Sequence, residues 1–238
     1  MYGKIISIHQ VEFLPWLGFF YKIMNSDIFV LYDLAQYNKQ DFQNRNVLNN
    51  KGNAIRIMIP VKKHPYNTMM QDIKICNSIN WQERIKRQIY NCYQKEPYFK
   101  EVISFVSIIW NEPWDNLCSL NFVLIQAICN YLGIKTKLVL TSSLPLDKKF
   151  SIEMNASEKL LEICKVLKTK HYISGSYGAG YLDENLFVNE RINVWITEFT
   201  KTKENYSILD YLFKYGKETL KIISGFGHIK PFINERIE

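Results

Sequence analysis

The sequence has no long hydrophobic run. No apolar stretch approaches the ~18–20 residues that a membrane span requires, so the chain is not expected to cross a bilayer. Its first stretch, MYGKIISIHQ, carries one lysine and soon turns polar and aromatic, which argues against a secretory signal peptide. We therefore expect a cytoplasmic protein.

Metal-binding motifs are also missing. Of the five cysteines no two form a CxxC pair, and most lie within apolar patterns of helical period. The histidines show no ligand spacing with one another or with a cysteine pair; they are His9, His64, His171 and His228. These patterns predict reduced, buried cysteines and a protein without a metal or a resident cofactor.

Charge of one sign is only mildly in excess. The chain holds 30 Lys+Arg against 23 Asp+Glu, a net charge of +7, which permits an anionic partner without identifying one. Basic and aromatic residues interleave over residues 84–99, but Ile85, Ile89 and Cys92 form an apolar stripe at helical spacing, so the cations are expected on a solvated face. With no nucleic-acid module recognisable, we predict no binding to nucleic acid.

The elements that are present indicate an α/β fold. Residues 4–8 predict a strand, 16–24 a helix and 27–31 a second strand, which is the pattern of a βαβ unit and a parallel sheet. Further strands are predicted at 54–61, 137–140, 172–175 and 193–196, and helices at 81–94, 99–110, 114–132, 155–168, 206–215 and 218–223. We expect a Rossmann-like, mostly parallel sheet in a single domain over 1–238, with a helical insertion at about 80–132.

Two segments lack a clear periodicity. The polar, amide-rich stretch 33–53 predicts a long loop that carries function, and the last dozen residues predict a surface tail.

Residues that follow predicted strands are candidates for chemistry. His9 and Gln10 end the first strand, and the carboxyl ends of strands face the ligand crevice in an open α/β sheet. His9 could act there as a general base or donate to an anion, or it could only cap the strand. Asp33 follows the second strand and could orient His9 or accept from a ligand, or it could only form a turn.

Two loops could contact a phosphate. Lys39 and Arg45 lie in the amide-rich stretch 36–46, where the cations could bind a phosphate and the amides a base or sugar; solvated loops have a similar composition. The glycine-containing turn 174–180 could bring backbone amides close to a phosphate, although it fits neither the Rossmann fingerprint nor a Walker motif and could be only a tight connection.

Several blocks together resemble the WbqC-like family. The first block is His9-Gln10, then Pro15-Trp16-Leu17-Gly18-Phe19-Phe20 and Lys22, and the second is Phe42-Gln43-Asn44-Arg45-Asn46. Weaker matches follow in order, among them Tyr98, Ser174-Gly175 and Tyr181-Leu182-Asp183, so the resemblance covers nearly the whole chain. Val11 replaces an expected proline, and Arg87 or a neighbour stands where the family pattern has a lysine-histidine pair.

The resemblance implies work on a nucleotide-linked sugar in surface-polysaccharide (O-antigen) biosynthesis. The reaction that it suggests is transfer of an acyl or aminoacyl group to an amino sugar, from an acyl carrier or a coenzyme A thioester. Its implied partners are the nucleotide-linked sugar and an acyl or aminoacyl carrier protein, and it leaves room for a homodimer.

The working hypothesis assigns roles to these residues. His9 would take a proton from the sugar amine, with Asp33 orienting the imidazole, while Lys39 and Arg45 would neutralise the diphosphate. The other predicted substrate-binding residues are Gln10, Gln43 and Asn46 for hydroxyls or an oxyanion, Trp16 or Tyr98 for stacking on a base, and Lys22, Ser174, Gly175 and Asp183.

Two other classes stay open at this point. The succession of a strand, a Pro-x-x-Gly turn and a helix over residues 5–24 resembles the corresponding segment of nucleotidylyltransferases of the HIGH type. Phe19, however, stands where the second histidine of that motif is expected. A non-catalytic protein that binds a sugar nucleotide would also suit the pattern; in that case His9 and Asp33 would titrate normally.

Overall fold

The core of the molecule is a six-stranded sheet. The computed structural model describes residues 3–150, 154–176, 178–180, 182–200 and 205–232. The strand order is β5-β2-β1-β6-β7-β8, with parallel pairing throughout except for the antiparallel pair of β7 and β8. The strands are β1 (Ile5–Gln10), β2 (Ile28–Tyr32), β5 (Lys137–Leu140), β6 (His171–Gly175), β7 (Asn193–Phe199) and β8 (Gly227–Pro231). The predicted Rossmann-like, mostly parallel α/β fold is confirmed.

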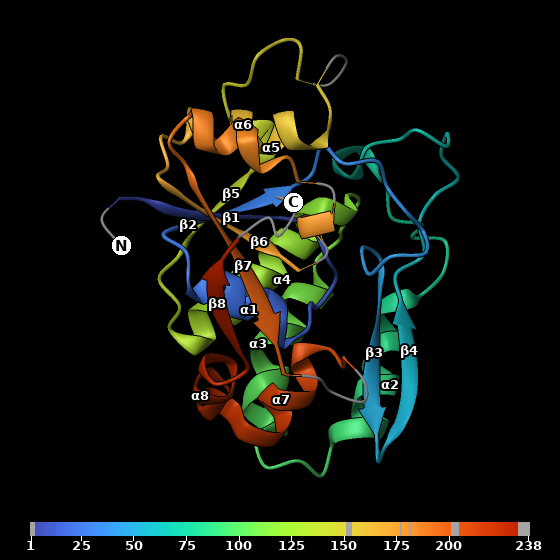
Figure 1. Ribbon diagram of the computed structural model, residues 1–238. Coiled ribbons are helices and arrows are strands. Elements are labelled where there is room, and N and C mark those ends of the chain that lie inside the picture. Colours follow the sequence, from blue (N-terminus) through green and yellow to red (C-terminus); the bar gives the residue numbers. More distant parts are fainter. Residues whose placement is uncertain (1–2, 151–153, 177, 181, 201–204, 233–238) are drawn as a thin grey trace.

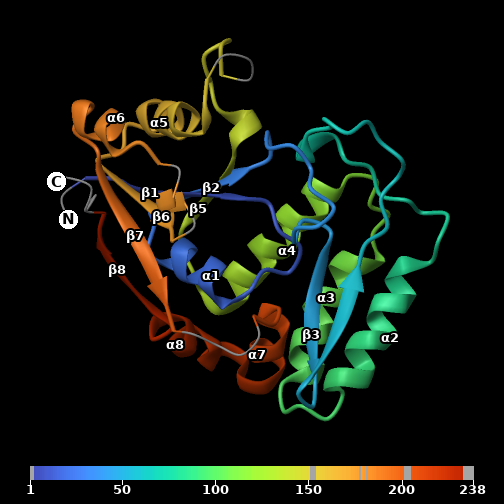
Figure 2. The ribbon, with the colours of Figure 1, turned by 45° about the vertical axis from the view of Figure 1, so that its right-hand side comes forward.

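Helices cover both faces of this sheet, which is why β2 carries apolar side chains on both of its faces. In β2, Ile28 and Val30 belong to one core cluster and Phe29 and Leu31 to the other. The first cluster is covered by α5 (Ala156–Val166) and α6 (Glu184–Asn189), and the second by α1 (Leu17–Met24) and α4 (Leu117–Leu132). Figures 1 and 2 show the two helical layers on opposite sides of the strands.

The predicted long loop 33–53 is wrong in its second half. Residues 45–58 form an antiparallel hairpin of β3 (Arg45–Asn50) and β4 (Asn53–Met58). Lys51 and Gly52 turn the chain with φ of 51° and 88°, the left-handed values that a tight hairpin requires. The prediction fails because the buried face of β3 carries the polar Asn46 next to Leu48, so the alternation of polar and apolar residues that marks a half-buried strand is missing.

Three predicted helices follow this hairpin: α2 (Trp81–Tyr93), α3 (Phe99–Asn111) and α4. All three lie in the sequence between β2 and β5, where the insertion is predicted, and α2 packs against the hairpin (Figure 2). Short 3-10 turns complete the connections, namely η1 (Met70–Asp72), η2 (Thr141–Ser143) and η3 (Gly178–Gly180).

The C-terminal part also differs from its prediction. After α7 (Ile208–Tyr215), η4 (Gly216–Glu218) and α8 (Thr219–Ser224), residues 227–231 form β8 and pair with β7, so this part of the expected surface tail is an edge strand. Residues 233–238 lie outside the described part of the chain.

None of the helices in the described ranges combines the length and the apolar composition that a bilayer span requires. Cys118, Cys129 and Cys164 are buried as predicted, whereas Cys76 and Cys92 are half-buried.

Candidate functional site

The order in which the chain adds strands to the sheet reverses at β1. The chain places β2 on one side of β1 and later places β6 on its other side, so the carboxyl ends of β1 and β6 form a topological switch point, where ligands bind in open α/β sheets. A cavity of about 640 Å³ lies at this edge. Its walls include Gln10 at the end of β1, Ser174 and Gly175 at the end of β6, and Lys159 on α5. We call it the switch-point cavity.

His9 lines this cavity with its ring against the edge of Phe19, at 4.9 Å between ring centroids. Its Nδ1 lies 3.0 Å from the backbone oxygen of Gln10, which can only accept a hydrogen bond. The neutral imidazole therefore carries its proton on Nδ1 and keeps Nε2 as an acceptor. Burial, and secondly the charge of Lys22, lower the pKa of His9 to about 3, so the ring is neutral at physiological pH.

Two further titratable groups line the same cavity. Glu12 Oε1 lies 3.8 Å from His9 Nδ1, while its buried Oε2 has no hydrogen-bond partner among the described residues. Burial raises the pKa of Glu12 to about 8, so this carboxyl is mainly protonated at neutral pH. Lys22 is 3% exposed and donates from Nζ to the carbonyl of Ile8 at 3.0 Å; burial lowers its pKa to about 7. We call His9, Glu12 and Lys22 the His9 cluster.

A chain of amide hydrogen bonds fixes the direction in which Gln10 is presented. The backbone N–H of Asn38 donates to Gln43 Oε1 at 2.8 Å, so the other end of that amide, Nε2, donates to Gln10 Oε1 at 2.9 Å. The amide nitrogen of Gln10 is left as a donor on the cavity wall, with no partner within the described ranges. Gln10 and Gln43, both predicted from the sequence, are thus brought together.

Asp33 does not occupy the predicted position beside His9. Its Oδ1 accepts from the backbone N–H of Ser142 at 3.0 Å and its Oδ2 accepts from the Ser142 hydroxyl at 2.5 Å. The side chain is buried and joins the end of β2 to the turn η2 after β5. The carboxyl beside the imidazole belongs to Glu12, which the sequence analysis missed although it follows His9 by three residues at the same strand end.

Other predicted residues are structural in this geometry. Asn46 is buried and donates from Nδ2 to the carbonyls of Phe13 and Leu14, at 2.9 and 2.8 Å, which braces the loop after β1. The indole of Trp16 packs edge-on against Phe199 at 5.0 Å between centroids, outside the residues that line the cavity. Neither side chain is placed to read a ligand there.

The remaining predictions fall elsewhere. Tyr98 covers Gly216, and Asp183 caps the N-terminus of α6 by accepting from Asn185 N–H at 3.1 Å. Arg45 Nε donates to Asn44 Oδ1 at 3.3 Å and is not among the cavity-lining residues. Lys39 lines a second, adjoining cavity, while Lys22, Ser174 and Gly175 line the first.

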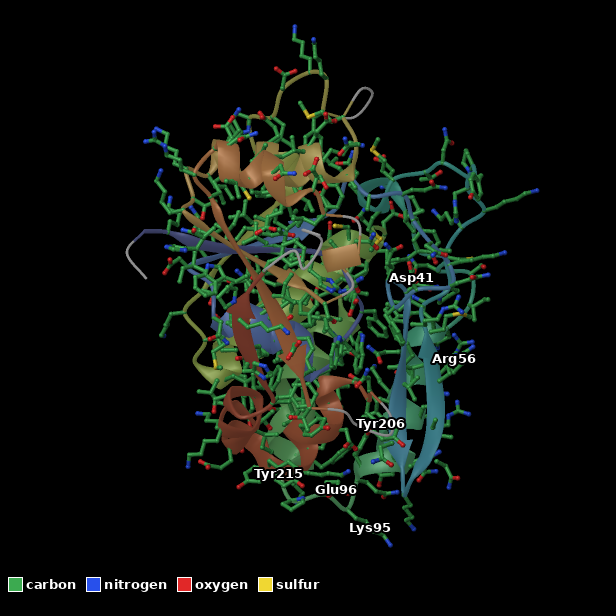
Figure 3. All side chains as sticks on the ribbon, viewed as in Figure 1. Asp41, Arg56, Lys95, Glu96, Tyr206 and Tyr215 are labelled. Atoms are coloured by element: carbon green, nitrogen blue, oxygen red, sulfur yellow. The ribbon has the colours of Figure 1, made fainter. Side chains whose placement is uncertain are left out.

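The loop 33–44 forms the outer wall of the switch-point cavity. Figure 3 places Asp41 on this loop, above the hairpin of β3 and β4. Asp41 lines the cavity and accepts from Asn38 Nδ2 at 2.8 Å, and its charge contributes to the raised pKa of Glu12. The half of the predicted functional loop that stays a loop is therefore the half that lines the site.

Comparisons with known proteins agree with the sequence blocks. The model of a family described as WbqC-like matches residues 10–222. A relative in Mycobacterium tuberculosis (strain ATCC 25618 / H37Rv), the uncharacterized protein Rv1507c, is 29% identical over 227 residues, which is 90% of this chain and 95% of the relative. No solved structure matches the chain significantly.

Proposed function

The chain belongs to the WbqC-like protein family, and from that premise we propose that it transfers an acyl or aminoacyl group to the amine of a nucleotide-linked sugar in surface-polysaccharide (O-antigen) biosynthesis. The observation that carries the proposal is a neutral imidazole with a proton-free Nε2 on the wall of the switch-point cavity. An amine that attacks a carbonyl must lose a proton, and such a nitrogen can take it.

The step uses the groups already described. The sugar amine forms a C–N bond to the carbonyl carbon of a thioester or ester, His9 Nε2 takes the amine proton, and the C–S or C–O bond breaks as the leaving group receives that proton. General-base help of this kind is typically worth ~10²–10⁴-fold in rate when the pKa of the base lies near the working pH. With its pKa lowered to about 3, His9 is a weaker base than a free imidazole, so its contribution lies toward the lower end of that range. The amide of Gln10 supplies a neutral donor for the developing oxyanion, and Lys22 supplies a charged one below its pKa of about 7.

Glu12 takes the positioning role that the sequence assigned to Asp33. When His9 becomes an imidazolium, its charge lies 3.8 Å from Glu12 Oε1, so a Glu12 that is already ionised would stabilise the protonated ring, and the carboxyl releases no proton during the step. In the resting state the carboxyl is mainly neutral, which avoids a buried carboxylate charge beside an uncharged imidazole.

Nucleotidyl transfer is not favoured by this geometry. The position of the second histidine of that motif holds Phe19, whose ring packs against His9 and offers no donor to a triphosphate.

The test incubates the protein with a UDP- or dTDP-linked amino sugar and a panel of acyl donors, and follows the mass of the sugar nucleotide. We expect acylated product with the wild type, a loss of at least about 100-fold with His9→Ala, and unchanged turnover with His228→Ala, whose exposed ring pairs with Glu198 on β7. Full turnover by a folded His9→Ala protein would contradict the mechanism. Binding of the sugar nucleotide without turnover from any donor would favour a non-catalytic role instead.

A further inference from the structure

A second cavity of about 930 Å³ adjoins the switch-point cavity. The two share three wall residues, Gln10, Gln36 and Asp41, so a ligand in one can continue into the other. The remaining wall comes from residues 37–40, 61–64 and 66 and includes three lysines, Lys39, Lys62 and Lys63. We call it the lysine cavity.

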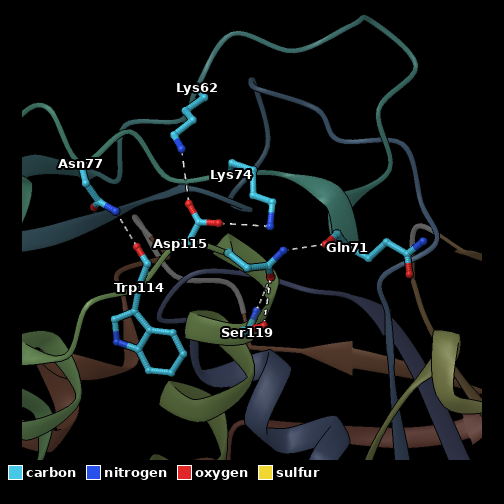
Figure 4. Close-up of polar contacts among 8 residues, drawn as sticks. Lys62, Gln71, Lys74, Asn77, Trp114, Asp115 and Ser119 are labelled. Carbon is cyan, nitrogen blue, oxygen red and sulfur yellow. Dashed lines mark hydrogen bonds and ion pairs between the residues drawn. The ribbon is translucent and has the colours of Figure 1, made fainter.

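The lysine cavity has a surplus of positive charge. Lys62 forms an ion pair with Asp115 at 3.4 Å, and Asp115 also pairs with Lys74 at 3.2 Å (Figure 4). Lys39 and Lys63 have no ion-pair partner within the part of the chain that the structure describes. Among the described residues of the wall one carboxylate, Asp41, faces these three lysines; it forms no ion pair with them and accepts a hydrogen bond from the neutral amide of Asn38. The wall therefore carries more positive than negative charge, with Lys39 and Lys63 free of ion pairs among the described residues, and it suits an anionic ligand.

The two loops that carry these lysines are tied together. Tyr37 N–H donates to the carbonyl of Thr68 at 2.9 Å, and Gln36 Nε2 donates to the carbonyl of Tyr66 at 2.7 Å. The second loop is also joined to the start of α4, because Asn116 Nδ2 donates to the carbonyl of Gln71 at 2.7 Å (Figure 4). These bonds fix the backbones of the two loops relative to each other, and both loops extend their lysines from the same wall.

Two tyrosines on this wall point to more than a bare anion. The ring of Tyr66 is 89% exposed, which is unusual for a large aromatic side chain. The backbone of Tyr66 is held in place by the hydrogen bond from Gln36 to its carbonyl. An exposed ring beside cations is the arrangement that stacks on a nucleobase while the cations hold the phosphates. Tyr37 is only 5% exposed, yet its buried hydroxyl has no hydrogen-bond partner among the described residues, so a polar ligand group could satisfy it.

From this geometry we infer that the lysine cavity binds the nucleoside diphosphate part of a ligand, with Lys39 and Lys63 on the phosphates and Tyr66 on the base. The group attached to the diphosphate then passes Gln10 into the switch-point cavity, toward His9. That second statement rests on the proposed function; binding of a nucleoside diphosphate does not. A nucleotide-linked sugar and the nucleotide end of coenzyme A share this chemistry.

Calorimetric titration with UDP, dTDP, coenzyme A and inorganic pyrophosphate tests the inference. We expect the double variant Lys39→Ala/Lys63→Ala to bind the preferred nucleotide at least tenfold more weakly. The control Lys135→Ala/Lys137→Ala removes the same charge at the amino-terminal end of β5, the sheet edge opposite the cavities, and should leave the affinity within twofold. Tyr66→Ala should weaken nucleotide binding several-fold and leave pyrophosphate binding unchanged. Preference for UDP or dTDP identifies the sugar nucleotide as the source, and preference for coenzyme A identifies the acyl donor.

Absence of binding by every nucleotide at millimolar concentration, or equal affinity for the two double variants, would overturn the inference. His9→Ala separates it from the proposed function. This variant should bind the nucleoside diphosphate within twofold of the wild type while it loses acyl transfer. Lysine-dependent binding without acyl transfer by the wild type would contradict the proposed function alone.

Discussion

Replacement of Lys22 by methionine should change how stability depends on pH. The ammonium is 3% exposed, and burial lowers its pKa from the ordinary 10.5 to about 7. Above pH 7 the folded state releases this proton, while the unfolded state holds it until about pH 10.5. Because the unfolded state then binds more protons, the contribution of Lys22 to stability rises with pH across this window. Lys22→Met removes that contribution.

The size of the effect follows from the shift. One pKa unit corresponds to roughly 1.4 kcal/mol, so between about pH 6.5 and about pH 9.5 the free energy of unfolding of the variant, relative to wild type, should fall by roughly 3 kcal/mol. The lost hydrogen bond to the Ile8 carbonyl lowers the stability of the variant at all pH values and does not alter this slope. Glu12 adds to the fall, since without Lys22 its pKa is higher still and its ionisation above pH 8 costs more in the variant.

Urea unfolding of both proteins at several pH values in this range measures the difference. Lys100→Met is the matched control, because Lys100 is an exposed lysine on α3 and its replacement should give a difference from wild type that is independent of pH. A pH-independent difference for Lys22→Met would refute the reasoning, since it would mean that Lys22 keeps an ordinary pKa in the folded protein.

Four further outcomes are expected. Asp33→Ala should lower the free energy of unfolding by about 1–3 kcal/mol, because both hydrogen bonds to Ser142 are lost. The same variant should keep kcat within twofold of the wild type. A large drop in kcat of the folded variant would support the role beside His9 that the sequence predicted for Asp33. Asn46→Ala should cost about 1–3 kcal/mol in chemical denaturation, because it leaves the buried Phe13 carbonyl unpaired and leaves the Leu14 carbonyl with the Ser207 hydroxyl alone. Gly216→Ala should cost about 1–3 kcal/mol, since φ is +52° and the new Cβ would lie 2.5 Å from the Tyr98 ring; an unchanged midpoint would show that this ring moves freely. Nitrogen-15 NMR should show the His9 ring neutral, with its proton on Nδ1, down to about pH 4, because its pKa is about 3, and a titration near pH 6.5 would contradict this.

Periodicity in the sequence predicts the central βαβ unit well. The second strand is apolar from Ile28 to Leu31, and the first is apolar at Ile5, Ile6 and Ile8, because helices cover both sheet faces; this signal lies within each segment. The strand end at His9 and Gln10 follows from the same local pattern, and so does the position of both residues at the ligand edge.

Long-range partners explain the wrong predictions. Asn46 faces the core, and its partners are carbonyls more than thirty positions earlier, so its polarity suggested a loop. Asp33 finds Ser142 109 positions later, which no local pattern could report. Glu12 lies in the loop before Leu14, whose φ of +46° is unusual for leucine, and the course of such a loop is not encoded in hydrophobic periodicity.

The central claim is that the switch-point cavity holds the amino sugar beside His9. Gly175 lines this cavity and a Cβ built on it meets no atom within 4 Å, so Gly175→Leu fills the cavity without a backbone clash. Gly225→Leu is the control, because Gly225 is exposed between α8 and β8 and a Cβ there meets only ordinary contacts. In calorimetric titration with a UDP- or dTDP-linked amino sugar, the account predicts binding to the wild type and the control, and affinity at least tenfold weaker for Gly175→Leu. Undiminished binding to a folded Gly175→Leu protein would contradict it.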